Sequence, residues 1–265
     1  MECGHFGAYL NIIFGTSRMT SYKFVYKEHD EEGHNTLKAV AQTHQFNRWM
    51  YDAIKPFLKG EIFEIGSGIG NITQYVMDDG FSITASDIRE GYCSTLQNRF
   101  QGKPFFAGVK KVDIAHLNFE QEYMHILNKF DCVIALNAIE HIEAHQQALV
   151  NCKKLLRENG RLIVLVPAFQ QLYNGFDVGL HHYRRYTRST LQQLFKQAGF
   201  VRNNTSYFNA AGVVGWWFSG RVLKHKILPA RQLFIFNKLV PLFRILDMLT
   251  LRKIGLSVIT VGNKN

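Results

Sequence analysis

The sequence predicts an α/β fold built on a doubly wound, mostly parallel sheet. Short apolar runs alternate with stretches of helical spacing from about residue 36 to residue 209, and such alternation is typical of βαβ units. Two runs, FDCVIALNAI (130–139) and RLIVLVP (161–167), are almost entirely apolar, as expected of parallel strands buried on both faces. The length of 265 residues suits one large domain, or a domain with an appendage.

The first half of the chain supplies three predicted strands, each preceded by a helical pattern. Apolar and aromatic residues recur at helical spacing over 36–58. The strand 62–65 then runs into a glycine-rich turn, and 82–88 is a second strand that closes on an acid. Helices are predicted around 73–77 and 96–100, before the third strand at 109–114.

The second half continues the same alternation. A helix over 146–157 connects the two apolar strands, and a helix over 187–200 has a threonine cap and a glycine stop. Strands at 204–209 and 256–262 complete the sheet. The predicted organisation is a loosely ordered extension over 1–35, a ligand-binding domain over 36–209, a helical insertion over 210–254 and a closing strand over 255–265. The sequence leaves two alternatives for the first residue of the protein, Met1 and Met19.

Charge is concentrated near the C-terminus. From Trp216 onward the chain has nine Lys/Arg and one acid, Asp247, a net +8 of the +10 carried by the whole chain. The remainder is close to neutral, so no uniform basic surface for nucleic acid is expected.

Cysteine and histidine spacing predicts no metal site. The four cysteines form no CxxC pair and no disulfide pattern, and the eleven histidines form no HExxH or similar set. This usage favours a reducing, cytoplasmic location. A run of 18 uncharged apolar residues is also absent from the sequence, so a spanning helix is not predicted.

The segment EIFEIGSGIGNIT (61–73) indicates a ligand site. Gly66, Gly68 and Gly70 follow a short strand at alternate positions. Glycines at a strand-to-helix turn let a ligand approach the backbone, which suits a dinucleotide, a mononucleotide or S-adenosylmethionine.

Two departures from the dinucleotide fingerprint GxGxxG favour the last of these ligands. The third glycine comes one residue early, so that Asn71 stands in its place, and Glu64 precedes the first glycine. A carboxylate there would repel a pyrophosphate, yet it could accept hydrogen bonds from an ammonium group. S-adenosylmethionine has an amino-acid end and no phosphate.

Acids or amides also end the next three predicted strands. Asp87 could accept both ribose hydroxyls, and Asp113 could accept the hydrogens of the adenine amino group. Asn137, Glu140 and His141 follow the fourth strand. Because ligands of such sheets bind beyond the carboxyl ends of the strands, these side chains are expected to share one site.

The motifs EIFEIGSGIGN, SDI, VDI, FDCVIALNAIEHI and GRLIVLVP resemble those of class I S-adenosylmethionine-dependent methyltransferases, in the same order. The resemblance implies a Rossmann-like sheet of seven strands with an antiparallel last strand. It also implies a set of cofactor-binding residues that contact the methionine end, the ribose, the adenine and the sulfonium. These residues are Glu64, Gly66, Ser67, Gly68, Gly70, Asn71, Asp87, Ile88, Asp113, Ile114 and Asn137. The segment LNAIEHI is most similar to small-molecule and quinone-type methyltransferases, which implies O- or C-methylation of a small or lipid-like acceptor.

Two segments are candidates for acceptor chemistry. His141 is the candidate general base, with packing or helix capping as the alternative. In the loop GFDVGLHHYRRYT (175–187), the substrate-binding candidates are Tyr183, Arg184, Arg185 and Tyr186. An arginine here could hold an anionic group of the acceptor, or could instead pair with Asp177. A similar HHYRRYT loop is found in methyltransferases of this subgroup.

The insertion over 210–254 has two alternative interpretations. Its Trp, Phe and Leu residues and its positive charge suit an interfacial helix pair on anionic lipid at the inner face of a membrane. They also suit a lid over the substrate pocket or a dimer face, so the oligomeric state stays open. For the whole chain, a NAD-dependent oxidoreductase and a non-catalytic S-adenosylmethionine-binding module remain the alternatives to a methyltransferase.

Overall fold

The computed structural model describes residues 31–223 and 229–265. Met1, Met19 and most of the predicted extension over 1–35 lie outside the described residues. Residues 31–35 correct the predicted boundary, because they belong to the first helix, α1 (Glu31–Ala41).

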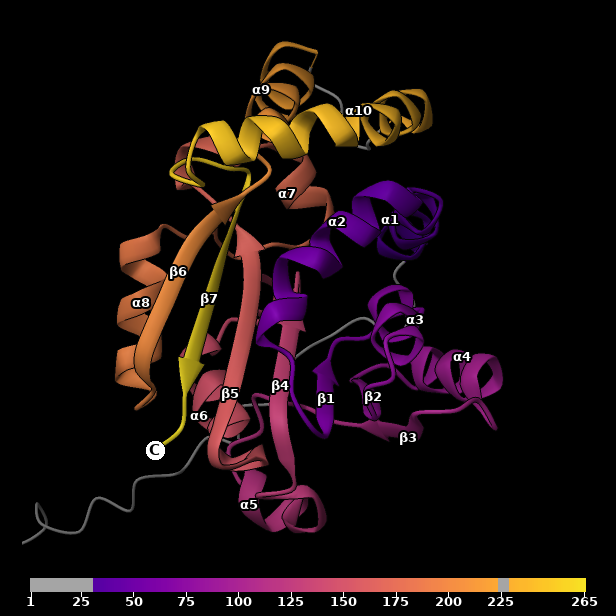
Figure 1. Ribbon diagram of the computed structural model, residues 1–265, viewed down its shortest axis with the longest axis vertical. Helices are drawn as coiled ribbons and strands as arrows, with labels where there is room; N and C mark the ends of the chain where they lie inside the picture. Colours follow the sequence, from indigo (N-terminus) through magenta and orange to yellow (C-terminus); the bar gives the residue numbers. More distant parts are fainter. Residues whose placement is uncertain (1–30, 224–228) are drawn as a thin grey trace, which may run out of the picture.

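One seven-stranded sheet forms the centre of the protein, with the strand order β3-β2-β1-β4-β5-β7-β6 (Figure 1). The strands β1 to β5 run parallel, and β7 lies antiparallel between β5 and β6. This arrangement confirms the predicted fold class, including the antiparallel last strand. The strands are β1 (Ile62–Ile65), β2 (Ile83–Asp87), β3 (Phe106–Lys111), β4 (Phe130–Leu136), β5 (Leu156–Pro167), β6 (Val201–Phe208) and β7 (Ser257–Asn263).

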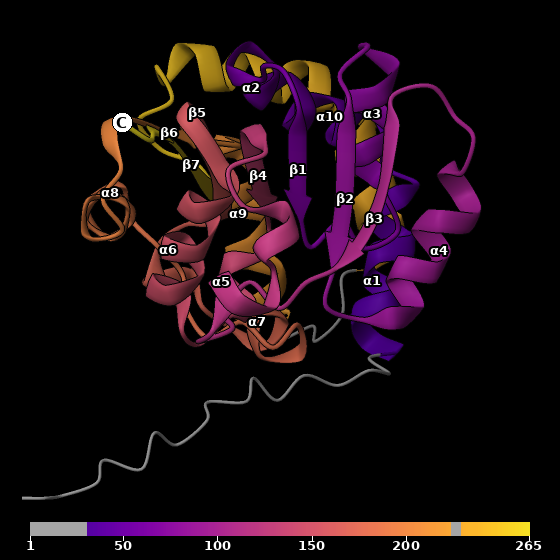
Figure 2. The same cartoon turned by 90° about the horizontal axis from the view of Figure 1, so that it is seen from below.

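Helices cover both faces of the sheet (Figures 1 and 2). The helices of the domain are α1, α2 (His44–Ile54), α3 (Asn71–Asp78), α4 (Glu90–Phe100), α5 (Phe119–Glu122), α6 (His145–Leu155), α7 (Gly175–Gly179) and α8 (Arg188–Gln197). Short 3-10 turns occupy Lys55–Phe57, Met124–Ile126, Ile139–His141 and Gln170–Leu172. The predicted threonine cap of α8 is present, since Thr187 and Thr190 form a reciprocal capping box.

The single helix predicted over 36–58 is divided into α1 and α2. The carbonyl of Val40 accepts hydrogen bonds from Thr43 Oγ1 at 2.6 Å and from Asn47 Nδ2 at 2.8 Å. The backbone N–H of Thr43 also donates to this carbonyl, at 2.9 Å, so the carbonyl is occupied without the N–H of His44 that would have continued α1. Polar side chains of this kind favour helix ends. Apolar spacing alone could not show the break.

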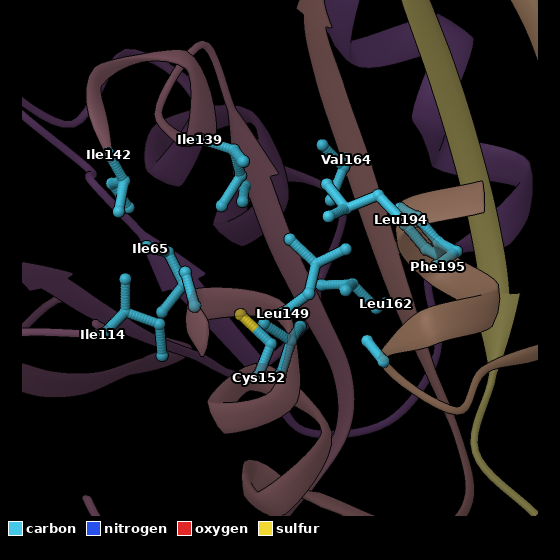
Figure 3. Packing of buried hydrophobic residues seen from close by; sticks show 14 of the residues in the cluster. Ile65, Ile114, Ile139, Ile142, Leu149, Cys152, Leu162, Val164, Leu194 and Phe195 are labelled. Atoms are coloured by element: carbon cyan, nitrogen blue, oxygen red, sulfur yellow. The ribbon is translucent and has the colours of Figure 1, made fainter. Parts of the chain in front are cut away.

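Alternation along the strands places apolar side chains on both faces of the sheet. Phe63 and Ile65 of β1 pack toward α6 and α8 in one buried cluster, whereas Ile62 packs toward α2, α3 and α4 in the other. Figure 3 shows the first cluster, where Leu149 and Cys152 of α6 lie against the strands. Burial on both faces explains the continuous apolar runs in the sequence.

The insertion consists of α9 (Ala210–Trp217), a π-helical turn (Phe218–Val222) and α10 (Ala230–Leu249), beyond the carboxyl ends of the parallel strands (Figure 1). Asp247 accepts the backbone N–H groups of Asn209 and Ala210 at 2.8 and 2.7 Å. Arg244 pairs with Asp52 of α2 at 2.8 Å. Polar side chains of α10 therefore attach it to the domain.

The opposite face of α10 is apolar and exposed. Among the described residues, fifteen of the twenty large apolar side chains that are exposed lie between Val214 and Ile254. Leu242, Met248 and Leu249 are 59, 69 and 75% exposed. No helix in the described part of the chain has the length and apolar character needed to cross a membrane.

Gly70 is expected to be essential for the turn after β1. Its φ is +82°, and an added Cβ would lie 2.3 Å from Cε2 of Phe100. We predict that Gly70→Ala lowers the free energy of unfolding by about 2–5 kcal/mol, because a left-handed conformation and overpacking act together. Urea unfolding measures this loss.

Gly91→Ala is the matched control, since nothing lies within 4 Å of an added Cβ there. Gly91 is in α4, where alanine favours the helix by up to about 1 kcal/mol. Equal stability of both variants would contradict the role assigned to Gly70.

Candidate active site

A cavity of about 660 Å³ lies at the carboxyl ends of the parallel strands. Its walls come from the loops after β1 to β5, from α1 and α2, and from the insertion. This position agrees with the rule that α/β sheets bind ligands beyond the strand ends. One part of the cavity is lined by the glycine loop and Asp87, and another by His141, His182 and Trp216.

The glycine loop has the backbone conformation that the sequence indicated. Gly66, Gly68 and Gly70 have φ values of +67, +54 and +82°, a region that residues with a Cβ adopt only with strain. Added Cβ atoms would lie 3.0 Å from Ala138 Cβ at Gly66 and 3.2 Å from Leu37 Cδ1 at Gly68. The first two glycines therefore keep the wall of the cavity open.

Asp87 connects the glycine loop to the end of β2. Its Oδ2 accepts the N–H of Gly68 at 3.1 Å and its Oδ1 accepts the N–H of Arg89 at 3.0 Å. Burial raises the pKa of this carboxyl, and the hydrogen bonds from Arg89 and Gly68 oppose that shift. Each oxygen has a second lone pair, and the residue lines the cavity.

Glu64 lies behind the glycine loop and is buried, with 4% of its surface exposed. Its Oε2 accepts a hydrogen bond from Thr73 Oγ1 of α3. Burial raises the pKa of Glu64 to about 7, while the hydrogen bonds from Thr73 and Ser67 act in the opposite direction. A cation near this carboxyl would favour its ionised form.

The residues after β3 and β4 complete the predicted cofactor side. Asp113 lies two residues beyond β3, and its Oδ1 accepts the N–H of Ala115 at 2.9 Å. Ile114 and Ile88 line the cavity beside it. Asn137 follows β4 with φ of +52°, and its Nδ2 lies 3.6 Å from the sulfur of Met50.

His141 ends a 3-10 turn after β4 and lines the cavity. Burial lowers its pKa to about 3, and the charges of His182 and Arg89 add to this shift. The imidazole is therefore neutral at physiological pH and weakly basic, whereas a general base is most effective with a pKa near the working pH. Its catalytic role stays a prediction.

Glu140 and His182 lie next to His141 in the cavity wall. The two imidazole rings have centroids 4.7 Å apart and are nearly perpendicular. Glu140 is completely buried, and neither of its carboxylate oxygens has a hydrogen-bond partner. Burial raises its pKa to about 7, which the charges of His182 and Arg185 partly offset.

The arginines of the 175–187 loop have structural partners. Arg185 is buried and donates to Asp177 Oδ1 at 2.8 Å and to the Ala168 carbonyl at 3.1 Å. Its guanidinium also lies 4.7 Å from the centroid of a Trp216 ring. The alternative pairing with Asp177 is therefore present, although Arg185 still lines the cavity.

Arg184 and Tyr186 do not line the cavity. Arg184 donates to the carbonyls of Ile142 and Glu143 at 3.3 and 2.9 Å. The hydroxyl of Tyr186 lies 2.8 Å from Nδ1 of His145. Direct contact of these two side chains with an acceptor, as predicted from the sequence, has no support in this geometry, because both are committed to the loop after β4. Tyr183 does line the cavity and is 47% exposed.

The cavity brings together most of the predicted site. Of the predicted residues it is lined by Gly66, Gly68, Asp87, Ile88, Asp113, Ile114, Asn137, His141, Tyr183 and Arg185. Glu64, Ser67, Gly70 and Asn71 support the glycine loop from behind or begin α3, and do not line the cavity.

Sequence reasoning missed several lining residues. Leu37 and Val40 of α1, Met50 of α2 and Trp216 of α9 belong to segments that precede or follow the strand motifs. Their apolar spacing indicated helices, but no local pattern indicated where those helices pack. His182 was visible only as part of an unusual aromatic and basic loop.

Comparison with known proteins identifies the family. Residues 63–164 match the family model described as "Methyltransferase domain". A ubiquinone biosynthesis O-methyltransferase from Rickettsia conorii is 32% identical over 106 residues, which is 40% of this chain and 34% of that protein. Lovastatin diketide synthase from Aspergillus terreus is 28% identical over 130 residues, which is 46% of this chain and 5% of that protein. The chain thus spans less than half the length of these relatives.

Solved structures share the fold at low identity. Phosphoethanolamine N-methyltransferase 2 from Haemonchus contortus, solved with phosphomonomethylethanolamine and S-adenosylhomocysteine, has a TM-score of 0.61 and 13% identity, over 91% of this chain and 61% of that chain. A S-adenosylmethionine-dependent methyltransferase from Archaeoglobus fulgidus has a TM-score of 0.53 and 16% identity, over 82% of this chain and 94% of that chain. Residues 63–164 therefore match a methyltransferase domain, and the sheet order and the glycine loop joined to Asp87 agree with the fold of S-adenosylmethionine-dependent methyltransferases.

Proposed function

We propose that the protein transfers a methyl group from S-adenosylmethionine to an oxygen or carbon atom of a small or lipid-like acceptor. The observation that carries this proposal is the continuity of the cavity. One wall holds the glycine loop and Asp87, and the same cavity reaches His141, Tyr183 and Trp216. Two ligands can therefore bind side by side, and alignment of reacting groups with exclusion of water accounts for much of such catalysis.

The residues of the first wall fit the cofactor. When bound, S-adenosylmethionine supplies an electrophilic methyl group on a sulfonium. The free lone pairs of the Asp87 carboxylate suit ribose hydroxyls, and the open backbone at Gly66 and Gly68 suits the methionine end. In this proposal Asp113 and Ile114 bind the adenine, and Asn137, which lies beside Met50 in the cavity wall, contacts the sulfonium.

Apolar side chains in the cavity wall favour an acceptor with an apolar body. Phe46, Leu165 and Phe208 line it together with Trp216, and Tyr183 and the histidines supply polar groups. The relatives include an O-methyltransferase of ubiquinone biosynthesis and polyketide synthases. These names support an acceptor with an apolar body and an oxygen or carbon nucleophile.

Replacement of Asp87 tests the cofactor site. We expect Asp87→Ala to weaken S-adenosylmethionine binding by about ten- to 150-fold, because a hydrogen bond to a charged group contributes roughly 1.5–3 kcal/mol. Calorimetry on the purified protein measures this, with Asp78→Ala as the control, since Asp78 is exposed on α3. NAD is expected not to bind. Tighter binding of NAD than of S-adenosylmethionine would overturn the proposed function.

Glu64 is expected to make cofactor binding pH-dependent. Glu64 does not line the cavity, so the ammonium group of a ligand would act on its carboxyl across the glycine loop. The positive charge favours the carboxylate, and the pKa of about 7 in the free protein then falls. Protons are then released on binding below about pH 7, so affinity rises with pH up to that value and levels off above it. Calorimetry at pH 6 in buffers of different ionisation enthalpy counts these protons.

The matched variant is Glu64→Gln, which keeps the size of the side chain and cannot ionise. Its binding should release fewer protons and should show a flatter pH dependence between about pH 5.5 and 7.5. The same proton count in both proteins would show that Glu64 does not respond to the ligand.

We also propose that the insertion contacts an anionic membrane surface, at the inner face of a membrane, and lets a lipid-like acceptor reach the cavity. The exposed face of α10 is apolar, whereas Asn237, Arg244 and Asp247 bind α2 and the end of β6. Arg231, Lys238, Arg252 and Lys253 are exposed around it. Apolar side chains flanked by basic residues are typical of interfacial helices. Lys224 and Lys226, which add to this charge in the sequence, lie outside the described residues.

Sedimentation with vesicles tests the membrane contact. The protein should sediment with anionic vesicles and only weakly with neutral ones, because each basic residue near an anionic surface contributes on the order of 1 kcal/mol. Met248→Ser/Leu249→Ser should weaken binding by at least about tenfold, since each inserted side chain contributes on the order of 1 kcal/mol or more.

The control is Met124→Ser/Leu117→Ser, which removes exposed apolar side chains elsewhere; Met124 and Met248 are 70 and 69% exposed. It should sediment like the unmodified protein. If neither vesicle type binds and Met248→Ser/Leu249→Ser instead abolishes a dimer in size-exclusion chromatography, the exposed face is a dimer face and the proposal fails.

A further inference from the structure

A buried carboxylate without a partner lies beside two histidines in the acceptor part of the cavity. Glu140 has no exposed surface, and both of its side-chain oxygens lack hydrogen-bond partners. Burying an acceptor group without a donor costs stability, and burying an unpaired charge costs more. Arg185, whose charge also acts on Glu140, is already engaged by Asp177 and a backbone carbonyl.

The donor atoms of Glu140, His141 and His182 converge. One ligand atom from each residue lies within 4.8 Å of the others. Ligands bound to zinc at about 2.1 Å in tetrahedral geometry lie about 3.4 Å apart. The three side chains would therefore have to close by up to about 1.4 Å around an ion, through changes in their χ angles.

Hydrogen bonds outside the cluster already orient the histidines. Nδ1 of His182 lies 2.9 Å from Asp177 Oδ1 in a buried pair, which leaves Nε2 directed away from Asp177. The backbone of Leu180 acts on the imidazole of His141 and opposes the lowering of its pKa by burial. Metal-binding histidines almost always use their second nitrogen in this way, with a carboxylate or a backbone carbonyl as partner.

We propose that Glu140, His141 and His182 bind a divalent transition-metal ion, with Asp177 as a positioning residue behind His182. Two imidazoles and one carboxylate suit Zn²⁺, Mn²⁺, Fe²⁺ or Co²⁺ better than Ca²⁺ or Mg²⁺, which prefer oxygen ligands throughout. Three protein ligands leave coordination positions open toward the cavity, as in catalytic rather than structural metal sites. The spacing rules applied to the sequence predicted no metal, because Glu140 and His141 are adjacent and His182 comes from another loop.

Such an ion would bind the acceptor as well as activate it, a role that rests on the proposed methyl transfer. A hydroxyl group on the ion loses its proton to water more easily, as metal-bound water does. The oxygen then forms the new bond to the methyl carbon, and the electron pair of the carbon–sulfur bond stays on sulfur. His141 would serve as a ligand in this arrangement, which agrees with its weak basicity as a free imidazole.

Metal binding itself is tested without any turnover. Protein freed of metal with a chelator is titrated with Co²⁺, and the visible absorption of bound Co²⁺ reports imidazole ligands. We expect one ion for each chain, displaced by Zn²⁺. Glu140→Gln and His182→Ala should each weaken binding by at least about 100-fold, since loss of a partner behind a ligand alone costs 10- to 100-fold. Asp177→Asn should weaken Co²⁺ binding by about 10- to 100-fold, and the visible absorption band of bound Co²⁺ should remain.

His125→Ala is the matched control, because His125 is exposed and lies in a separate turn. It should bind Co²⁺ like the unmodified protein. Absence of a Co²⁺ band in the unmodified protein, or equal affinity in Glu140→Gln, would overturn the metal site. Thermal unfolding shows whether each variant folds. If a variant does not fold, the Co²⁺ titration of the unmodified protein tests the metal site by itself. Calorimetry with S-adenosylmethionine separates the two proposals, since failure of cofactor binding with intact Co²⁺ binding would refute only the methyl transfer.

Discussion

The hydrogen bond from the Gly68 N–H to the Asp87 carboxylate is the contact on which the cofactor side of the site depends. It joins the loop after β1 to the end of β2 at 3.1 Å, and the second oxygen of Asp87 fixes the start of α4 through Arg89. The contact with Gly68 is buried and that with Arg89 is partly buried, so water competes weakly for the first of them. The carboxylate thus holds the loop in its left-handed turns and still offers lone pairs to a ligand. Some lone pairs of the Asp87 carboxylate accept the backbone N–H groups, and the others can accept hydrogen bonds from a ligand.

The sequence predicted the parts of the fold that depend on local pattern. The strand at 62–65 agrees with β1 in full, and the apolar run at 161–167 lies within β5. Such runs are informative because strands buried on both faces must be apolar. The break between α1 and α2 was missed because it depends on two side chains bound to one carbonyl. Asp113, predicted to end the third strand, lies two residues beyond it.

The site was less predictable where its residues come from separate loops. The adjacency of Glu140 and His141 was visible in the sequence, but the position of His182 depends on the fold of the 175–187 loop. That loop is held by Asp177, which accepts from Arg185 and lies beside His182. A buried carboxylate is stable there because two donors and the capping of α7 share it. The arginine expected to hold a substrate therefore holds the loop, which in turn places His182 in the cavity wall.

The spacing of polar and apolar residues in the sequence also did not predict which face of α10 packs against the domain. Polar residues occur in the sequence at 237, 244 and 247, and such a stripe normally faces water. Here the backbone N–H of Phe46 donates to Asn237, Arg244 pairs with Asp52, and Asp247 accepts from the end of β6. Each polar group has a specific partner on the domain, so the apolar face has no position left except the outside. The polar side chains of this helix thus attach it to the domain, and the proposed anionic membrane surface is what would cover its apolar face. Trp216 of the same insertion lines the cavity, so the element that would touch a membrane also forms part of the acceptor site.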